Sequence, residues 1–540
     1  MLTLHAHSTY SFLTGTIPYE RLIDLAKQYG SKYVALTDTN GMYGLIQFAK
    51  LAEDEGIKPI LGALIDDPAD SEINMLILAK NNEGYSQLCK IITTRKLKDD
   101  FKVAELLYED VSNLFLISSS IKLLTEEKER IKNLPDFYVE LIVTEKLKKK
   151  TRELYQFAKD NNIKFIASQP AYFETKEDFF LHKVVTAIRE NSTIDNVDQS
   201  LLVDEEFYFH SPTEIKKIWS KLSEALENVE YIADNCNVDL KFGEYKFPIY
   251  PLPEGESATA VLRKLAYEGL KKKYKPLTQK AIDRLEFELG IIEELGFSNY
   301  FLIVWDIVRE AKRRRIITIG RGSAADSLVS YCLDFTQVDP IKHDLYFERF
   351  LNVGRKDPPD IDLDFSWKER DEIIKYVFDR YGYDKVAMIS TTVTFKARSA
   401  FREVAKAFGI PNAEVSKYSK FIPWTSAKNL TNLDNNFPEA KSLDFSQKPW
   451  KQIVEIASRL SGFPRHLSIH PGGIIITPKP ITNYVALEYA KNKGLGLIIT
   501  QPDMYPIEYA GLIKIDLLSQ RALGVLRDTM NAIDKNRNDL

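Results

Sequence analysis

Three aspartates alternate with three hydrophobic residues in the stretch "DPPDIDLDFSW" at residues 357–367. Asp360, Asp362 and Asp364 would share one face of a β-strand, because successive side chains of a strand point to opposite faces. Neighbouring carboxylates repel one another and are seldom buried without partners, so this face requires positive charge. Hard oxygen ligands suit Mg²⁺, and two such ions could support phosphoryl transfer. An acidic strand neutralised by arginines for purely structural reasons is the alternative.

A glycine-containing loop, "TIGRGSAADS" at residues 318–327, precedes the acidic strand and links a short strand to an apolar helix. Gly320, Arg321, Gly322 and Ser323 would let the backbone approach an anion closely, and a helix N-terminus offers free N–H groups. The spacing fits neither a Walker A loop nor a dinucleotide-binding fingerprint. A surface glycine turn that carries an arginine is an equally simple interpretation.

Further charged residues lie close to these two stretches in the sequence. Arg349 and Arg355 come just before the acidic strand, and the basic run 312–315 comes just before the loop. Arginine side chains match the oxygens of phosphate groups well. These residues therefore add to the evidence for a phosphate-bearing ligand.

A second alternating stretch, "GLIKIDLLSQR" at residues 511–521, puts Lys514 and Asp516 on one strand face. Asp516 would complete a metal cage if the fold brought it beside the acidic strand. Lys514 is expected either to contact a phosphate or to be solvated. His470, in "RHLSIHPGG", is expected to be a polar residue of a loop or strand edge.

Composition restricts the class of protein. The chain has 540 residues, 44% of them hydrophobic and 28% charged, which predicts about three globular domains. The net charge of −4 excludes wholesale basic character, so any contact with nucleic acid must depend on local patches. Three scattered cysteines, the lack of a signal-peptide pattern and the lack of a long apolar run predict a cytoplasmic protein without a membrane span.

The elements that must position these residues can be read from periodicity. Residues 1–230 alternate apolar strands with helical stretches, which predicts a parallel α/β sheet or barrel. The predicted strands of this region are residues 32–38, 74–80, 113–120, 136–143 and 163–169. A proline-rich boundary follows at residues 247–256, then helices to about Ile316, and a mostly helical pattern from Asp371 to about Leu460. Strands are expected again in "HPGGIIITPKP" and "GLGLIITQPD".

Long ordered motifs resemble a known family. Residues 320–365, "GRGSAADSLVSYCLDFTQVDPIKHDLYFERFLNVGRKDPPDIDLDF", resemble the palm of the bacterial DNA polymerase III α subunit, the C-family replicative polymerase. The N-terminal "LHAHSTYSFLTG" and "YVALTDTNGMYGLIQF" resemble the PHP domain of that family. The resemblance covers essentially the whole chain.

The resemblance implies an α/β and α+β multidomain fold. A PHP-type distorted (β/α) barrel would be followed by a nucleotidyltransferase-type palm, similar to that of polymerase β, with an inserted helical thumb. The implied domains are a PHP domain at 1–230, the first part of the palm at 231–393, the thumb at 394–469, and the second part of the palm with the start of the fingers at 470–540.

The resemblance also assigns roles to individual residues. Asp360, Asp362 and Asp516 fall on the catalytic carboxylates, which would hold two Mg²⁺ ions for attack of a primer 3′-hydroxyl on a deoxynucleoside triphosphate. Asp364 is expected to support them. The residues that fall on nucleotide-binding positions are Gly320, Arg321, Gly322, Ser323, Arg349, Arg355 and Lys514.

The PHP region departs from the family pattern. His5, His7 and Asp38 remain, but Thr39, Leu64, Pro170 and Tyr172 replace expected metal ligands. Leucine, proline and tyrosine are poor substitutes for such ligands, so we expect no PHP metal cluster and no phosphoesterase or proofreading activity. In the glycine loop, Thr318 and Asp326 stand where the family tends to have glycine, and Asp326 would repel a nearby phosphate.

The family implies primer-template DNA and a deoxynucleoside triphosphate as ligands. Its sliding clamp, clamp loader, helicase and proofreading subunit are implied partners, although most of the segments that bind them are expected to lie outside this chain. We expect the chain to stop before the fingers, so whether it is active alone stays open, and it contains no exonuclease insertion in the PHP region. The alternative functions are a PHP-type phosphoesterase and a non-catalytic DNA-binding or scaffold fragment.

Overall fold

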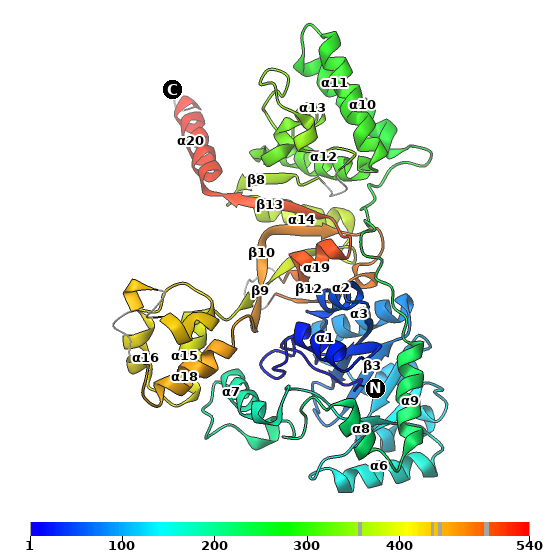
Figure 1. The fold of residues 1–540 in the computed structure, drawn as a ribbon. Helices are drawn as coiled ribbons and strands as arrows, with labels where there is room; N and C mark the ends of the chain where they lie inside the picture. The colour runs from blue at the N-terminus through cyan, green and yellow to red at the C-terminus, as the bar shows by residue number, and fades with distance from the viewer. Residues whose placement is uncertain (1, 355–358, 434–436, 441–444, 491–495, 539–540) are drawn as a thin grey trace.

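The structure, a computed structural model, describes residues 2–354, 359–433, 437–440, 445–490 and 496–538. It is a mixed α/β fold in which two sheets and two helical bodies follow one another along the molecule (Figure 1). Across these residues, every helix is too short or too polar to cross a membrane.

The N-terminal region is built on a six-stranded sheet whose strands lie in sequence order. They are β1 (Tyr33–Leu36), β2 (Lys58–Asp66), β3 (Asn74–Ala79), β4 (Leu114–Ser118), β5 (Phe137–Ile142) and β6 (Lys164–Ser168). All five predicted strands are confirmed. The expected parallel pairing holds for β1 with β2 and for β4, β5 and β6, but not for β3, which pairs antiparallel with both neighbours. The link from β2 to β3 is too short for the crossover that parallel neighbours need.

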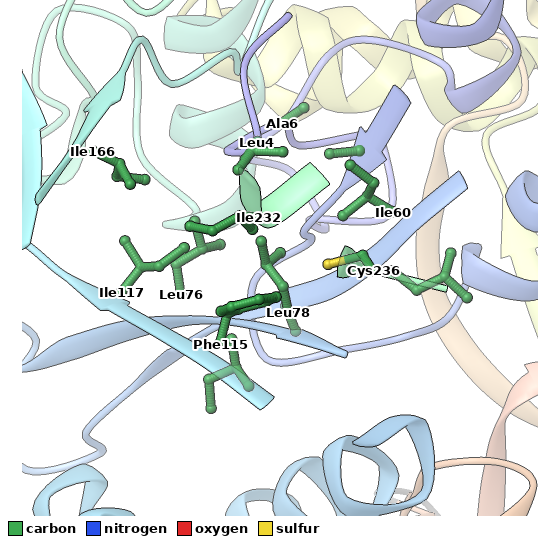
Figure 2. Close-up of a cluster of buried hydrophobic side chains, with 14 of the residues drawn as sticks. Leu4, Ala6, Ile60, Leu76, Leu78, Phe115, Ile117, Ile166, Ile232 and Cys236 are labelled. Atoms are coloured by element: carbon green, nitrogen blue, oxygen red, sulfur yellow. The ribbon is translucent and has the colours of Figure 1, made fainter. Parts of the chain in front are cut away.

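Helices surround this sheet and complete its core. They are α1 (Tyr19–Gln28), α2 (Leu45–Asp54), α3 (Asn82–Leu97), α4 (Ile121–Glu126), α5 (Lys128–Ile131), α6 (Lys148–Asp160), α8 (Pro212–Ile218) and α9 (Ser223–Asn235). The helix between α6 and α8, α7 (Phe179–Arg189), packs its apolar side chains outside this core. Figure 2 shows Leu76 and Leu78 of β3, Phe115 and Ile117 of β4 and Ile232 of α9 within one buried cluster. Burial of these side chains is the main force that holds the region together.

A second sheet of seven strands occupies the middle of the molecule, in the order β11-β12-β9-β10-β13-β8-β7. Its strands are β7 (Thr318–Arg321), β8 (Asp362–Ser366), β9 (Val386–Thr394), β10 (Pro464–Ile476), β11 (Leu487–Tyr489), β12 (Ile498–Asp503) and β13 (Lys514–Gln520). The sequence prediction missed β9, which lies inside the stretch expected to be mostly helical. Its first five residues are all buried, and such a run lacks the alternation that identifies a strand.

A group of helices lies on one side of this sheet, next to the glycine loop of residues 318–327. They are α10 (Ala258–Lys273), α11 (Gln279–Glu294), α12 (Ser298–Arg313) and α13 (Leu328–Cys332), with α14 (Arg370–Tyr381) beside the strands. Figure 1 shows α10 to α13 as a helical body next to β8. Its apolar side chains share one core with the sheet, including Phe301 of α12 and Leu363 of β8. The remaining helices are α19 (Met504–Tyr509), which precedes β13, and α20 (Arg521–Asn538), which follows it.

A separate helical body projects from the ends of β9 and β10 (Figure 1). It contains α15 (Ala397–Ala407), α16 (Asn412–Ser419) and α18 (Trp450–Arg459). Leu181 and Val184 of α7 belong to the same hydrophobic cluster as Phe401 and Ile453 of this body. A helix that precedes this body by about 200 residues in the sequence is therefore part of its core.

Buried hydrogen bonds join the two sheets. The Tyr43 hydroxyl donates to Glu488 Oε2 at 2.6 Å, and the Met42 N–H donates to Gln501 Oε1 at 2.8 Å. Because buried polar groups are costly unless paired, these contacts define how the N-terminal region and the central sheet fit together.

Candidate metal and nucleotide site

Strand register brings three carboxylates together on two neighbouring strands of the seven-stranded sheet, β13 and β8, the latter next to the edge strand β7. β13 runs parallel to β8, and Asp516 lies opposite Asp362 in this pairing. Asp360 lies two residues before Asp362, on the segment that leads into β8. The three side chains can each present an oxygen within 4.8 Å of the others. In the described part of the chain, this is the one group of acidic, histidine or cysteine residues that converges in this way.

The triad of Asp360, Asp362 and Asp516 places three carboxylates beside only two nearby cations, Lys514 and Arg321. Burial, together with the charges of Asp360 and Asp516, raises the pKa of Asp362 above its usual value. Asp516 is 5% exposed, and its Oδ1 has no hydrogen-bond partner among the described residues. Crowded carboxylates with an unpaired buried oxygen match the hard-oxygen donor set that Mg²⁺ prefers. The residues present therefore fit a divalent cation, as the sequence predicted.

Lys514 lies at the edge of the triad. Its Nζ bonds Asp516 Oδ2 at 2.7 Å and lies 3.9 Å from Asp360 Oδ1. Burial alone would lower the pKa of Lys514, but the bond to Asp516 and the charges of Asp516 and Asp360 outweigh it and raise the pKa. The side chain is thus paired and charged, so the solvated alternative is wrong.

Arg321 balances the acidic strand from the other side. β7 pairs antiparallel with β8, and Arg321 lies opposite Asp362. The guanidinium lies 3.5 Å from Asp362 Oδ2 and 3.4 Å from Asp364 Oδ2. Asp364 is buried and sits outside the triad, so its contact with Arg321 agrees with the supporting role expected for it.

The glycine loop is closely packed against its neighbours. A Cβ on Gly320 would lie 2.3 Å from the Phe335 carbonyl oxygen, so the chain can come this close only with glycine there. Gly322 has φ +75°, a left-handed conformation that favours glycine. Gly322 to Asp326 form a 3₁₀ turn, and α13 begins only after it.

The N-terminus of α13 does not offer the free N–H groups that the sequence interpretation assumed. The N–H groups of Leu328 and Val329 donate to the buried Glu288 carboxylate at 2.9 and 3.0 Å. Ser327 Oγ also donates to Glu288, at 2.8 Å, and caps the Ser330 N–H. Glu288 therefore takes the place that a phosphate was expected to occupy, and any anion must be bound by other groups.

Arg284 holds two segments of the predicted nucleotide site together. It pairs with Glu288 at 2.6 Å and donates to the carbonyls of Asp326 and Leu345 at 3.2 and 3.1 Å. The sequence prediction missed both Arg284 and Glu288. Their spacing of four on a helix was the available signal, but it is also typical of ordinary surface ion pairs.

The other basic residues predicted for the site differ in their exposure and in their ion-pair partners. Arg349 is 71% exposed and lies 3.7 Å from the buried Asp326 carboxylate. Arg355 lies outside the described residues. In the basic run 312–315, Arg313 and Arg314 bond to Glu310, so this carboxylate partly neutralises their charge.

The residues of the PHP site are buried within the N-terminal region, where Nδ1 of each histidine has a partner but Nε2 of His5 and of His7 has none among the described residues. His5 Nδ1 lies 2.7 Å from Glu140 Oε1, and His7 stacks on Tyr172 with ring centroids 3.9 Å apart. Asp38 accepts bonds from Ser8 and Ser11, each at 2.7 Å. These contacts tie the three residues into the core, and Tyr172 occupies the space on one face of His7.

Burial also sets the charge of these groups. Burial and the nearby His5 lower the pKa of His7 well below its usual value, and burial raises the pKa of Asp38 to about 6 despite its hydrogen bonds. The absence of a PHP metal cluster stays a prediction.

Sequence comparisons agree with this geometry. Residues 3–146 match the PHP domain, and residues 260–519 match the family described as the bacterial DNA polymerase III alpha NTPase domain. The chain therefore contains a PHP domain followed by a domain of the bacterial DNA polymerase III alpha NTPase family.

Individual relatives extend the match over nearly the whole chain. The DNA polymerase III subunit alpha of Halalkalibacterium halodurans is 35% identical over 97% of this chain and 48% of that protein. The corresponding subunit of Bacillus subtilis is 33% identical over 99% of this chain and 50% of that protein. An error-prone DNA polymerase of Symbiobacterium thermophilum is 33% identical over 98% of this chain and 52% of that protein. The chain thus spans about half the length of the curated relatives it matches.

Proposed function

We propose that this chain supplies the catalytic palm of a DNA-directed DNA polymerase, which transfers a nucleotide from a deoxynucleoside triphosphate to a primer 3′-hydroxyl. The observation that carries the proposal is the convergence of Asp360, Asp362 and Asp516 in a domain of this family. Primer-template DNA and the triphosphate are the proposed ligands.

The three aspartates are the proposed ligands of two Mg²⁺ ions. Bound there, Mg²⁺ would activate the attacking hydroxyl and neutralise charge on the leaving pyrophosphate. The chain would hold these carboxylates in fixed positions, because Asp362 and Asp516 project from adjacent strands of one sheet. Asp360 is the most exposed of the three and lies where substrate can approach.

Basic side chains on both sides of the triad would orient the triphosphate. Arg321 lies beside Asp362, and Lys514 lies beside Asp516 and Asp360. Both are cations beside carboxylates, so they can bind phosphate oxygens once a metal ion neutralises the acids. Arg349 is exposed and is the proposed third contact.

The proposed domain division follows the sequence. The PHP domain would comprise 1–230, the palm 231–393 and 470–540, and the thumb 394–469. The hydrophobic clusters of the N-terminal sheet, the central sheet and the α15–α18 body support it, except that α7, within residues 1–230, packs in the cluster of the α15–α18 body. We propose that the PHP domain acts as a structural support without phosphoesterase activity, because Leu64 and Pro170 stand at expected ligand positions and Tyr172 stacks on His7.

Two measurements test the function. Isothermal titration calorimetry of this chain should show Mg²⁺-dependent binding of a deoxynucleoside triphosphate that is lost in Asp360→Ala. Primer extension by the complete polypeptide in Mg²⁺ should be abolished by either Asp360→Ala or Asp516→Ala. Full extension by both variants would contradict the assignment of the catalytic carboxylates, and Mg²⁺-independent triphosphate binding would contradict the role of the triad in binding.

A further inference from the structure

His470 lies where strand β10 departs from regular pairing, next to the triad. Ile469 of β10 pairs with Ser390 of β9, but the next pair is Ile474 with Met388. Residues 470–473 are therefore a bulge in β10. On the other edge of the same strand, Gly473 lies opposite Asp516 of β13.

The imidazole ring closes this bulge by accepting hydrogen bonds. The Gly473 N–H donates to His470 Nδ1 at 2.6 Å, and the Gly472 N–H approaches the same atom at 3.3 Å. A Cβ on Gly473 would lie 2.7 Å from Nδ1, and one on Gly472 would lie 2.5 Å from Leu518 Cδ2. The two glycines thus make room for the ring on one side and for β13 on the other.

These hydrogen bonds determine whether the His470 ring can donate a proton to the Asp516 carboxylate. His470 Nδ1 is 3.6 Å from Asp516 Oδ1, but its lone pair already accepts the backbone N–H groups. A nitrogen that accepts these bonds carries no proton, so it has nothing to donate to the carboxylate. Lys514 bonds Oδ2, whereas Oδ1 is buried without a hydrogen-bond partner among the described residues.

We propose that His470 is a positioning residue for the triad. It holds the bulge that presents Asp516 to Asp362, and it does so as an acceptor, which leaves Oδ1 of Asp516 open to a divalent cation. A donor in the place of Nδ1 would bond Oδ1 and compete with the cation. The inference rests on the proposed function, because it takes the triad as a metal site.

Three substitutions separate this role from a general effect on folding. In His470→Asn, Oδ1 replaces Nδ1 as the acceptor, whereas in His470→Gln the side-chain oxygen lies near the position of Nε2. His470→Ala removes the polar atoms at both the Nδ1 and the Nε2 positions. Mn²⁺ binding to the chain, followed by electron paramagnetic resonance, should be within about threefold of wild type for the asparagine variant. It should be about tenfold weaker or more for the glutamine and alanine variants, as is usual when a residue that orients a metal ligand is lost.

A second measurement does not depend on the metal. Nitrogen-15 NMR of histidine-labelled protein should show the His470 ring, identified by its absence in His470→Asn, with Nδ1 unprotonated and the proton on Nε2. A proton on Nδ1 would overturn the proposal, as would wild-type Mn²⁺ affinity in His470→Ala while Asp516→Asn has lost it. Wild-type affinity retained in Asp516→Asn would instead overturn the metal site itself, and with it the proposed function.

Discussion

Asp516 and Asp362 are register partners on two parallel strands that lie more than 150 positions apart in the sequence. Parallel neighbours place equivalent side chains on the same face of a sheet, so this single pairing converts two separate alternating patterns into one acidic surface. Asp360 reaches the same surface from the segment before β8.

Removing a triad carboxylate should weaken divalent-cation binding. We expect Asp360→Asn and Asp516→Asn each to lower Mn²⁺ affinity by about tenfold or more, because each removes one charged oxygen ligand from a small donor set. Asp379→Asn, an exposed change on α14, is the matched control. Titration calorimetry gives the affinities, and equal weakening by all three variants would show that the effect is one of net charge alone.

Lys514 should affect cations and anions in opposite directions. Its ammonium group bonds Asp516 Oδ2, so Lys514→Met should strengthen Mn²⁺ binding and weaken triphosphate binding, each by up to about tenfold. Lys375→Met on α14 is the control, since Lys375 is an exposed lysine of another element. Both affinities can be measured on one preparation by calorimetry. A change of the same sign for both ligands would argue that Lys514 acts only on folding.

Replacing Gly320 by a residue with a side chain should lower the stability of the protein. The Cβ of Gly320→Ala would lie 2.3 Å from the Phe335 carbonyl oxygen, and such overpacking typically costs about 1–3 kcal/mol. Gly290→Ala is the matched change, because a Cβ there meets nothing within 4 Å and alanine favours the helix. Scanning calorimetry should show a lower melting temperature for the first variant and an unchanged or higher one for the second. The reverse order would contradict the packing described for the glycine loop.

His182 should make the packing of α7 against the segments that contain Thr14 and Val203 sensitive to acid. The ring is fully buried, with Nδ1 2.8 Å from the Thr14 carbonyl oxygen and Nε2 accepting the Val203 N–H at 3.2 Å. Burial lowers its pKa from 6.5 to about 4, and the Arg189 charge adds to the effect against the Thr14 carbonyl. Below pH 6.5 the unfolded chain therefore takes up a proton that the folded chain refuses.

The free energy of unfolding of this region should thus fall as the pH decreases from 6.5 to 4, by up to about 3 kcal/mol, since a pKa unit corresponds to about 1.4 kcal/mol. Urea titrations at several pH values measure it. His182→Gln should remove this part of the pH dependence, whereas His343→Gln, which changes an exposed histidine, should leave it intact. An unchanged slope in His182→Gln would assign the acid sensitivity to other groups.

Much of the candidate site was predictable because its signals are local. The alternation of Asp360, Asp362 and Asp364 lies within one short stretch, and so does that of Lys514 and Asp516. Strands such as 74–79 and 114–118 were recognisable because short apolar stretches alternate with helical periodicity in that region. Chemistry that depends on residue type and on nearby spacing can be read directly from the sequence.

What depended on distant partners could not be read in this way. β9 looked like part of a helical stretch, since burial on both faces of a central strand removes the alternation. The direction of β3 and the use of Glu288 to cap α13 also follow from contacts between separate elements. Periodicity along the chain contains no information about which element packs against which.

The sequence by itself determined the acidic and basic residues, the family they resemble and the faces on which they lie. Tertiary structure alone decided that Asp516 lies opposite Asp362, that Lys514 pairs with an acid rather than with water, and that His470 accepts rather than donates. The physical reason is that hydrogen bonds and ion pairs depend on distances of about 3 Å. Such distances are set by strand register and packing, which form only when remote segments meet.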